Sequence, residues 1–364
     1  MNIPILDLKR QYTNLKDEIG QAIQGVLEST QFILGPNLKE LENKIAAYCN
    51  VRYGIGVANG TDALELTLKA LNIGEGDEVI TTPFTFIASA EVASKVGAKP
   101  VFADIDPDTY LIDVDKIEEK ITERTKAIIP VHIFGQMCDM DKMMKIAEKH
   151  NLYIIEDSCQ AIGSEYKGKK SSSFGIAGCF SFYPTKNLGG YGDGGMIVTD
   201  DEELAAKLKI LRAHGSNPKY YHSMFGYNSR LDELQAAILN VKFKYLDEWN
   251  RRRREIAHRY NEKLKVKVPK EATYGQYHTY HQYTIEVDDR KQFEDYMKAN
   301  GIGTCIYYPV PLHLQEVYKS LGYKKGDFPN TEKACERVIS IPISPEMTAA
   351  EQEHVIATIN NFFK

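Results

Sequence analysis

The sequence predicts an α/β fold with a second, smaller α+β domain at its C-terminal end. Three observations support this prediction. Apolar runs of four or five residues recur between positions 78 and 199, amphipathic helical stretches separate several of them, and this alternation stops near position 230. Strands that are apolar throughout and alternate with helices are typical of a mainly parallel sheet covered on both faces.

The predicted elements of the larger domain follow in order. Apolar residues at helical spacing indicate two helices near the N-terminus, one through Leu15, Ile19, Ile23, Val26 and Leu27, the other through Leu38, Leu41 and Ile45. The predicted strands are Glu78–Thr82, Pro100–Ala103, Ala127–Val131, Tyr153–Glu156, Cys179–Phe182 and Met196–Thr199. The helices between them are Ala63–Leu71, Ala88–Val96 and Met140–His150.

The pattern changes in the last third of the chain. Residues 231–264 contain few helix breakers and predict one or two long helices that link two domains. Beyond them the sequence predicts a strand at 281–287, a helix at 292–300, a strand at 304–308 and a last helix opened by the capping box Thr348–Glu351. We therefore expect domains at residues 1–240 and 241–364.

Composition narrows the class of protein. The 364 residues carry 45 Lys and Arg against 50 Asp and Glu, a net charge of −5, which argues against a nucleic-acid or anionic-membrane binder. The arginine run 251–254 has acidic neighbours and predicts a solvated, salt-bridged helix face. Charges interrupt the N-terminus where a signal peptide would be apolar, and the six cysteines form no CxxC pair. We expect a cytoplasmic enzyme without a metal.

Two motifs predict sites for a charged ligand. Asn59-Gly60-Thr61-Asp62 opens a helix, and free N–H groups there can bind an anion, although a plain helix cap would give the same pattern. Asp157 ends an apolar strand, at the edge where open α/β sheets bind ligands. That carboxylate could pair with a buried cationic nitrogen, cap the next helix or bind magnesium.

Two further motifs follow Asp157. Ser181-Phe-Tyr-Pro-Thr-Lys186 runs from a strand into a proline turn that presents a lysine; a desolvated lysine there can form a Schiff base, whereas a surface lysine is the plain alternative. Residues 190–195 match GxGxxG, yet they precede a strand instead of linking a strand to a helix, which excludes a dinucleotide site. We expect the glycines of 187–195 to let the backbone pass beneath a flat ligand.

Five motifs together carry a family resemblance: NGTDAL (59–64), EDSCQAIG (156–163), SFYPTKNLGGYGDGG (181–195), GYNSRLDELQAAIL (226–239) and YYPVPLHLQ (307–315). In this order they resemble the DegT/DnrJ/EryC1/StrS nucleotide-sugar aminotransferases, which are fold-type-I enzymes dependent on pyridoxal phosphate (PLP). The resemblance covers essentially the whole chain. It implies an obligate homodimer with shared active sites, and pyridoxamine phosphate as the cofactor form in the second half-reaction.

The resemblance also implies roles for particular residues. Lys186 would form the Schiff base with the cofactor and then move the proton, and Asp157 would hold the ring nitrogen protonated. Gln160 would lie near the ring hydroxyl, and Phe86, with Phe84 as its rival, would stack on the ring. The remaining cofactor contacts would be Gly60, Thr61 and Ser181 at the phosphate, with Asn228 from the partner subunit.

The substrate implied is a nucleotide-linked keto sugar, with L-glutamate as the amino donor. Family members that deoxygenate sugars carry histidine in place of the lysine, so Lys186 favours transamination. Tyr183 and the Asp193-Gly-Gly195 motif resemble members that aminate C3 more than those that aminate C4. A TDP-linked 3-keto-6-deoxyhexose is the first expectation, and a UDP-linked 3-keto-N-acetylaminosugar or its uronic acid is the second. A silent PLP-binding regulatory protein is the non-enzymatic alternative.

Three residues are candidate substrate contacts. Tyr183 would lie near the hexose, and Arg230 could pair with the pyrophosphate oxygens. His313 could bond a sugar hydroxyl or the diphosphate, and an ordinary structural histidine is an equal alternative.

Overall fold

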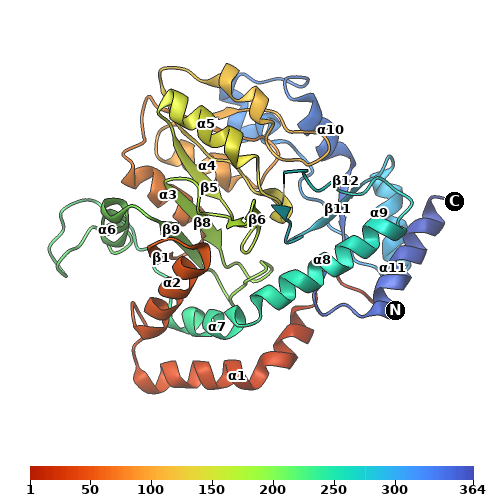
Figure 1. The fold of residues 1–364 in the computed structure, drawn as a ribbon, viewed down its shortest axis with the longest axis horizontal. Coiled ribbons are helices and arrows are strands. Elements are labelled where there is room, and N and C mark those ends of the chain that lie inside the picture. The colour runs from red at the N-terminus through yellow and green to blue at the C-terminus, as the bar shows by residue number, and fades with distance from the viewer. Residues whose placement is uncertain (275) are drawn as a thin grey trace.

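A seven-stranded sheet forms the centre of the molecule in the computed structural model, which describes residues 1–274 and 276–364 (Figure 1). The strand order is β1-β9-β8-β5-β4-β2-β3. The bounds are β1 Tyr53–Val57, β2 Glu78–Thr81, β3 Lys99–Phe102, β4 Thr125–Ile128, β5 Tyr153–Asp157, β8 Ala177–Ser181 and β9 Gly195–Thr199. All six predicted strands of the larger domain are confirmed within one to three residues at their ends, and β1 was not predicted.

Strand direction brings the predicted motifs to one edge of the sheet. β3, β2, β4, β5 and β8 are parallel, so Asp157 and Ser181 end their strands at the same edge. β9 runs antiparallel to both of its neighbours, and its first residue, Gly195, is paired with Ser181 of β8 and with Val57 of β1. The chain after β1 therefore enters its helix beside the ends of β5 and β8.

Helices cover both faces of this sheet, as the apolar strands predict. Apolar side chains of α3, α4 and α6 pack with one face, and those of α2, α5 and α7 pack with the other. Two neighbouring residues of β8 point to opposite faces of the sheet. Cys179 packs with side chains of α3, α4 and α6, and Phe180 packs with side chains of α2 and α7. The bounds are α2 Pro36–Cys49, α3 Gly60–Ala70, α4 Ala88–Lys95, α5 Met140–His150, α6 Glu202–Leu211 and α7 Glu233–Phe243.

Two long helices leave this layered unit. α1 (Leu8–Ser29) packs on α7, and α8 (Leu246–Lys263) continues from α7 toward the C-terminal part of the chain (Figure 1). There a separate apolar cluster joins α8 with strands and helices from residues 283–362. The elements of this part are β11 Tyr283–Glu286, α9 Arg290–Ala299, α10 Pro329–Arg337, β12 Val338–Ile341 and α11 Ala349–Phe362. A small sheet links the two parts of the chain. It consists of β6 Glu165–Tyr166, β7 Lys169–Lys170 and β10 Gln276–Tyr277.

The C-terminal part confirms most of its predicted elements. The capping box is present, with the Thr348 hydroxyl accepting from the Glu351 N–H and the Glu351 carboxylate accepting from the Thr348 N–H. The strand predicted at 304–308 was wrong, because only Cys305 bridges to Ser340 of β12 before the chain turns away and brings Tyr308 to Gln160. The N-terminus also joins this part of the fold, since the Ile3 N–H donates to the Gly301 carbonyl over 2.8 Å.

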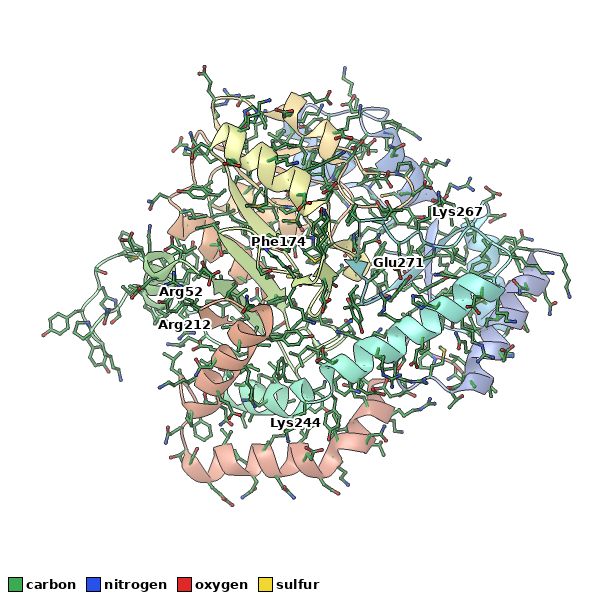
Figure 2. All side chains as sticks on the ribbon, viewed as in Figure 1. Arg52, Phe174, Arg212, Lys244, Lys267 and Glu271 are labelled. Carbon is green, nitrogen blue, oxygen red and sulfur yellow. The ribbon has the colours of Figure 1, made fainter. Side chains whose placement is uncertain are left out.

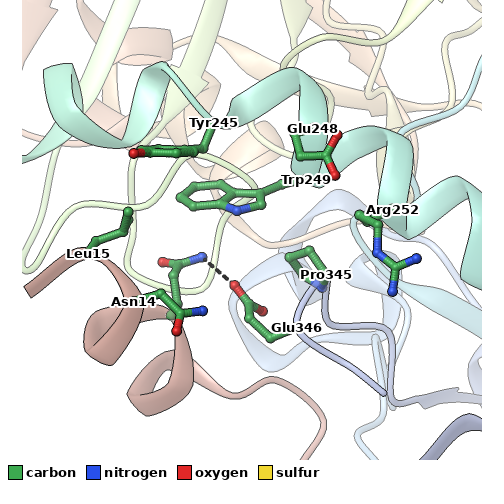
Figure 3. A pocket seen from close by; sticks show the side chains of 9 residues that line it. Asn14, Leu15, Tyr245, Glu248, Trp249, Arg252, Pro345 and Glu346 are labelled. Carbon is green, nitrogen blue, oxygen red and sulfur yellow. Dashed lines mark hydrogen bonds between the residues drawn. The ribbon is translucent and has the colours of Figure 1, made fainter. Parts of the chain in front are cut away.

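One surface pocket lies well outside the motifs. It has a volume of about 330 Å³ between α1, α8 and residues 345–346, with the Trp249 and Tyr245 rings stacked over it and Gln11 bonded to Glu346 (Figure 3). None of the predicted cofactor or substrate residues is part of its wall.

In the described ranges no helix has an apolar stretch suited to a bilayer crossing, and no three His, Cys, Asp or Glu side chains gather as a metal site would require.

Candidate active site

The start of α3 and the end of β8 form a narrow cradle. A Cβ added at Gly60 would lie 2.8 Å from Ser181 Cβ and 2.8 Å from Cys159 Sγ, so only glycine allows this approach. The Asn59 carboxamide caps the helix by accepting from the Asp62 N–H over 2.8 Å. The N–H groups of Gly60 and Thr61 have no acceptor within the helix and can bind an anion in front of Ser181.

Asp157 is held as a buried acceptor at the same edge. Asp157 is 6% exposed, and its Oδ2 accepts from the Ser89 hydroxyl over 2.6 Å. The Cys159 N–H donates to Oδ1 over 3.2 Å. Both donors are uncharged groups that fix the orientation of the carboxylate.

Ser89 is a site residue that the sequence did not single out. It lies in the first turn of α4, fully buried, with Thr85 bonded to it at 3.0 Å. Its position after the predicted strand 78–82 places it at the ligand-binding edge of the sheet. That position is the feature of the sequence from which Ser89 could have been predicted as a site residue.

The neighbour of Asp157 has a structural role. Glu156 is completely buried and accepts hydrogen bonds from the N–H groups of Ser172, Phe174 and Gly175. His132 Nε2 lies 3.0 Å from the same carboxylate. Glu156 thus ties the loop before β8 to β5 and fixes the strand end from which Asp157 projects.

Lys186 is presented by the turn that follows β8. Its N–H donates to the Tyr183 carbonyl over 2.8 Å, which closes the turn at the proline. Part of the side chain reaches solvent, yet protein atoms surround it closely enough that desolvation lowers the pKa of the Lys186 amine, while the neighbouring acidic groups of Cys159 and Asp157 oppose this shift. A lowered pKa gives the amine a larger unprotonated fraction, as a nucleophile or base requires.

Aromatic and amide side chains complete one side of the site. Gln160 Oε1 accepts from the Phe134 N–H over 2.8 Å, and its Nε2 donates to the Tyr308 hydroxyl over 3.1 Å. The Phe86 ring is 54% exposed and lies 6.4 Å from the Tyr308 ring, whereas Phe84 is completely buried in the core. Of the two rivals, only Phe86 has a ring free to stack on a ligand.

The glycines of the loop after Lys186 allow close approaches of the backbone. A Cβ at Gly195 would lie 2.3 Å from the Asn59 carbonyl oxygen, and one at Gly189 would lie 2.3 Å from that of Pro184. The close approach is therefore between segments of the chain itself. Lys242, which is 1% exposed, donates to the Gly189 carbonyl and lies over the Tyr191 ring, 4.8 Å from its centroid.

The candidate substrate residues differ in exposure, because Tyr183 and Arg230 reach the surface and His313 is buried. Tyr183 is 54% exposed beside the lysine turn, and Arg230 is partly exposed with its guanidinium on the Asn228 carboxamide. His313 is 1% exposed, and its Nε2 lies 3.1 Å from Glu332. Burial lowers the pKa of His313. Its ring packs against Phe328, and these contacts favour the structural interpretation, although its buried Nδ1 has no hydrogen-bond partner among the described residues.

Asn228 lies at the base of a projecting segment. Its side chain is exposed, and the next residue, Ser229, donates to Asp62 over 2.6 Å and accepts from the Ala58 N–H over 3.1 Å. This contact attaches the segment to the helix start that carries Gly60 and Thr61. The Asn228 side chain accepts from Arg230 at the surface.

These residues fit PLP. The start of α3 offers free N–H groups for a phosphate beside Ser181, the Asp157 carboxylate offers a partner for a ring nitrogen, and Lys186 lies close enough to Asp157 for that group to act on its amine. When bound, PLP supplies an aldehyde that condenses with amines and a ring that accepts electrons.

Comparison with known proteins agrees with this geometry. Residues 13–360 match the DegT/DnrJ/EryC1/StrS aminotransferase family. The chain is 51% identical to a protein of Geobacillus stearothermophilus named "Pleiotropic regulatory protein", over 100% of this chain and 99% of that one. It is 48% identical to a dTDP-3-amino-3,6-dideoxy-alpha-D-galactopyranose transaminase of Aneurinibacillus thermoaerophilus, over 99% of both. It is 47% identical to a UDP-N-acetyl-3-dehydro-alpha-D-glucosamine 3-aminotransferase of Acidithiobacillus ferrooxidans, over 98% and 96%.

Solved structures are similar over the same length. DesV of S. venezuelae, in complex with a ketimine intermediate, has a TM-score of 0.97 and 40% identity over 99% of this chain and 98% of that one. A Bacillus subtilis structure with bound PMP has a TM-score of 0.91 and 34% identity over 99% and 85%. A Streptococcus pneumoniae structure in its PLP form also matches, with a TM-score of 0.90 and 29% identity over 95% of both chains.

The fold is therefore that of the fold-type-I aminotransferases, and the cofactor is pyridoxal phosphate. The chain is an enzyme, an aminotransferase acting on nucleotide sugars, and not the silent binding protein considered from the sequence. With five motifs in order and a match over residues 13–360, this chain belongs to the DegT/DnrJ/EryC1/StrS aminotransferase family.

Proposed function

We propose that the enzyme transfers the amino group of L-glutamate to C3 of a nucleotide-linked 3-keto sugar, with a TDP-linked 3-keto-6-deoxyhexose as the first candidate. One observation carries the choice of C3: two relatives matched over nearly their whole length are named for 3-amino or 3-keto sugars. Tyr183 and Asp193, in their motifs, support the same carbon.

The roles of the residues follow from their places. Lys186 is the base that moves a proton between the substrate carbon and the cofactor, because its lowered pKa favours the free amine. Asp157 keeps the ring nitrogen protonated, and Ser89 holds that carboxylate in place. Phe86 would stack on the ring and Gln160 would lie near its hydroxyl. Gly60, Thr61 and Ser181 bind the phosphate at the start of α3.

Two subunits share each site in this proposal. Residues 215–226 project beyond α6, away from the rest of the chain (Figures 1 and 2), and they carry Tyr220, Tyr221 and Phe225, which are 78%, 72% and 103% exposed. Aromatic side chains fully open to water favour a partner surface. We assign that surface to a second copy of this chain, with Asn228 reaching the partner's phosphate and Arg230 its substrate.

Two further expectations belong with this proposal. The division into domains at residues 1–240 and 241–364 agrees with the separate apolar cluster of the C-terminal part. A cytoplasmic location agrees with the six cysteines, all of which are free thiols.

The test is the visible absorption spectrum of the purified enzyme. We expect a yellow band that bleaches when L-glutamate is added without sugar and returns when the correct keto sugar follows. A panel of TDP- and UDP-linked 3-keto and 4-keto sugars then identifies the substrate, and NMR of the product identifies the aminated carbon. Absence of a band after incubation with PLP would overturn the proposed role of Lys186.

The UDP-linked sugar remains the second candidate because two relatives, at 47% and 42% identity, are named for such substrates. The two candidates differ in the nucleotide, in the acetamido group at C2 and at C6. A return of the band with the UDP-linked substrate alone would replace the first candidate by the second. Amination at C4 would contradict both.

A further inference from the structure

The residue after Lys186 is tied to a histidine from the C-terminal part of the chain. Asn187 and His281 are 4% and 6% exposed, and Asn187 Oδ1 lies 3.0 Å from His281 Nδ1. Asn187 also bonds to Asn250, which is 1% exposed. Three polar side chains so deeply buried must satisfy one another, so their orientations can be worked out from donors and acceptors.

A backbone carbonyl sets the orientation of the whole chain of bonds. Asn250 Nδ2 donates to the Ile162 carbonyl over 3.1 Å, and a carbonyl only accepts. The Asn250 oxygen therefore faces Asn187 and accepts from its Nδ2 over 2.8 Å. The same Nδ2 lies 3.4 Å from a second acceptor, the Thr279 carbonyl. The amide oxygen of Asn187 is thus the atom that faces the histidine.

This orientation determines the tautomer of His281. An amide oxygen has no hydrogen to give, so the hydrogen of the 3.0 Å bond belongs to His281 Nδ1. Burial, together with the positive charges of Lys186 and Arg253, lowers the pKa of His281 well below its usual value. The ring is therefore neutral, with Nδ1 protonated and Nε2 carrying a lone pair.

The segment that carries His281 also supports the other side of the site. The His281 N–H donates to the Phe134 carbonyl over 2.7 Å, and the Phe134 N–H donates to Gln160 Oε1. One short segment of the C-terminal part thus backs both the lysine turn and the glutamine beside the ring.

We infer that His281 is a positioning residue for the transamination: as the Nδ1–H tautomer it holds Asn187, and through it the main chain of Lys186, in the orientation that the base requires. The inference rests on the proposed role of Lys186. Because the hydrogen bond is donated by the ring, a side chain that only fills the same space does not replace it.

The first experiment compares three variants of the holoenzyme. His281→Asn retains an N–H donor near the position of Nδ1, His281→Leu removes it, and Asn187→Asp places an oxygen where Nδ2 meets two acceptors. Thr284→Val is the matched control, since Thr284 is 1% exposed on the same segment and bonds only to Ser340, at 2.8 Å. The readouts are the pH midpoint of the visible cofactor band and the rate constant of its bleaching by glutamate.

We expect His281→Leu and Asn187→Asp to shift the pH midpoint by about one unit and to slow bleaching about tenfold with little change in the KM for glutamate. His281→Asn should recover most of both values, and Thr284→Val should change neither. If His281→Leu behaves as Thr284→Val does, or if His281→Asn recovers nothing, the inference is wrong. A wild-type enzyme with no band would instead overturn the proposed function.

A second experiment reads the tautomer without the reaction. Long-range proton–nitrogen NMR of enzyme labelled with ¹⁵N-histidine distinguishes protonated from unprotonated ring nitrogens, and His281→Asn identifies the His281 signals by their loss. We expect Nδ1 to be protonated and Nε2 not, at neutral pH. An Nε2–H tautomer or a charged ring would overturn the inference whatever the activities of the variants.

Discussion

The Ser89 hydroxyl donates a hydrogen bond of 2.6 Å to Oδ2 of Asp157, in the interior of the site. The two residues come from α4 and β5, far apart in the sequence, and both are buried. The bond fixes the direction of the carboxylate, which is what a partner for a ring nitrogen needs.

Replacing Ser89 by alanine should therefore weaken cofactor binding without unfolding the protein. A hydrogen bond to a charged group contributes about 1.5–3 kcal/mol, so we expect the Kd for PLP to rise roughly tenfold to a hundredfold. Equilibrium titration followed by the visible band measures this. Ser173→Ala is the control, because that hydroxyl bonds only to the Lys170 carbonyl. Equal Kd values for the two variants would contradict the role of Ser89.

Lys186→Ala should abolish the reaction. Removal of the base and Schiff-base lysine is expected to lower kcat roughly a thousandfold or more, measured as the rate of bleaching by glutamate in stopped flow. Lys167→Ala, at an exposed lysine paired with Asp141, should leave this rate unchanged. A Lys186→Ala enzyme that still turns over near the wild-type rate would refute the assignment.

Alanine should lower PLP affinity at one glycine, Gly60, and raise the stability of a helix at another, Gly20. At Gly60 the new Cβ meets Cys159 and Ser181 at 2.8 Å, so the cradle must widen and PLP affinity should fall at least tenfold. At Gly20, inside α1, a Cβ meets no atom within 4 Å, and alanine should stabilise the helix by about 0.5–1 kcal/mol. Thermal unfolding and PLP titration of both variants test the pair. A Gly60→Ala enzyme with unchanged affinity would place the phosphate elsewhere.

Lys242 should make stability depend on pH in the alkaline range. Burial lowers the pKa of Lys242 from 10.5 to about 8, an effect that the charge of Glu346 only partly opposes. Between these two values the unfolded chain holds a proton that the folded chain has released, so folding becomes more favourable as pH rises. Relative to Lys242→Met, the wild type should gain up to about 3 kcal/mol between pH 7 and pH 10.5. Denaturant unfolding of both proteins measures the difference in their free energies of unfolding. A difference that does not change with pH would contradict the lowered pKa of Lys242.

Phe225→Ser should weaken the proposed homodimer and leave the monomer fold intact. Phe225 is 103% exposed in the single chain, so its replacement removes no internal contact, whereas burial against a partner contributes about 2 kcal/mol. Sedimentation velocity over a dilution series should show dissociation at concentrations at least tenfold higher than for the wild type. PLP should be lost with the dimer. Val317→Ser, at a residue 64% exposed elsewhere on the surface, should behave as the wild type.

The sequence predicted those parts of the site that depend on strand ends. Asp157 and Lys186 were found because each follows an apolar run, and parallel pairing then brings the ends of such runs together. Ser89 was missed, because one hydroxyl in a helix carries no signal until the helix is placed against β5. The Asn187–His281 bond was missed for the same reason, since its partners meet only in the folded chain.

Local charge patterns predicted less than strand ends did. In the arginine run, Arg251 and Arg252 pair with Glu255 on an exposed face, as expected. Arg253, between them and Arg254, is 3% exposed and donates to the Ile343 carbonyl over 2.5 Å. Successive helical residues point in directions about 100° apart, so a run of one residue type cannot all lie on a solvated face.

The pairing of β1 with β9 has a consequence for how the enzyme is made. Tyr53 pairs with Thr199, and Gly195 closes against Asn59, so the first strand of the sheet acquires its partner only after nearly two hundred residues have left the ribosome. Until then the start of the helix at Asn59 and Gly60 lacks the strand that closes against it. A nascent chain arrested before β9 should therefore remain colourless in the presence of the vitamin-derived cofactor, and colour should develop only once translation has passed this strand.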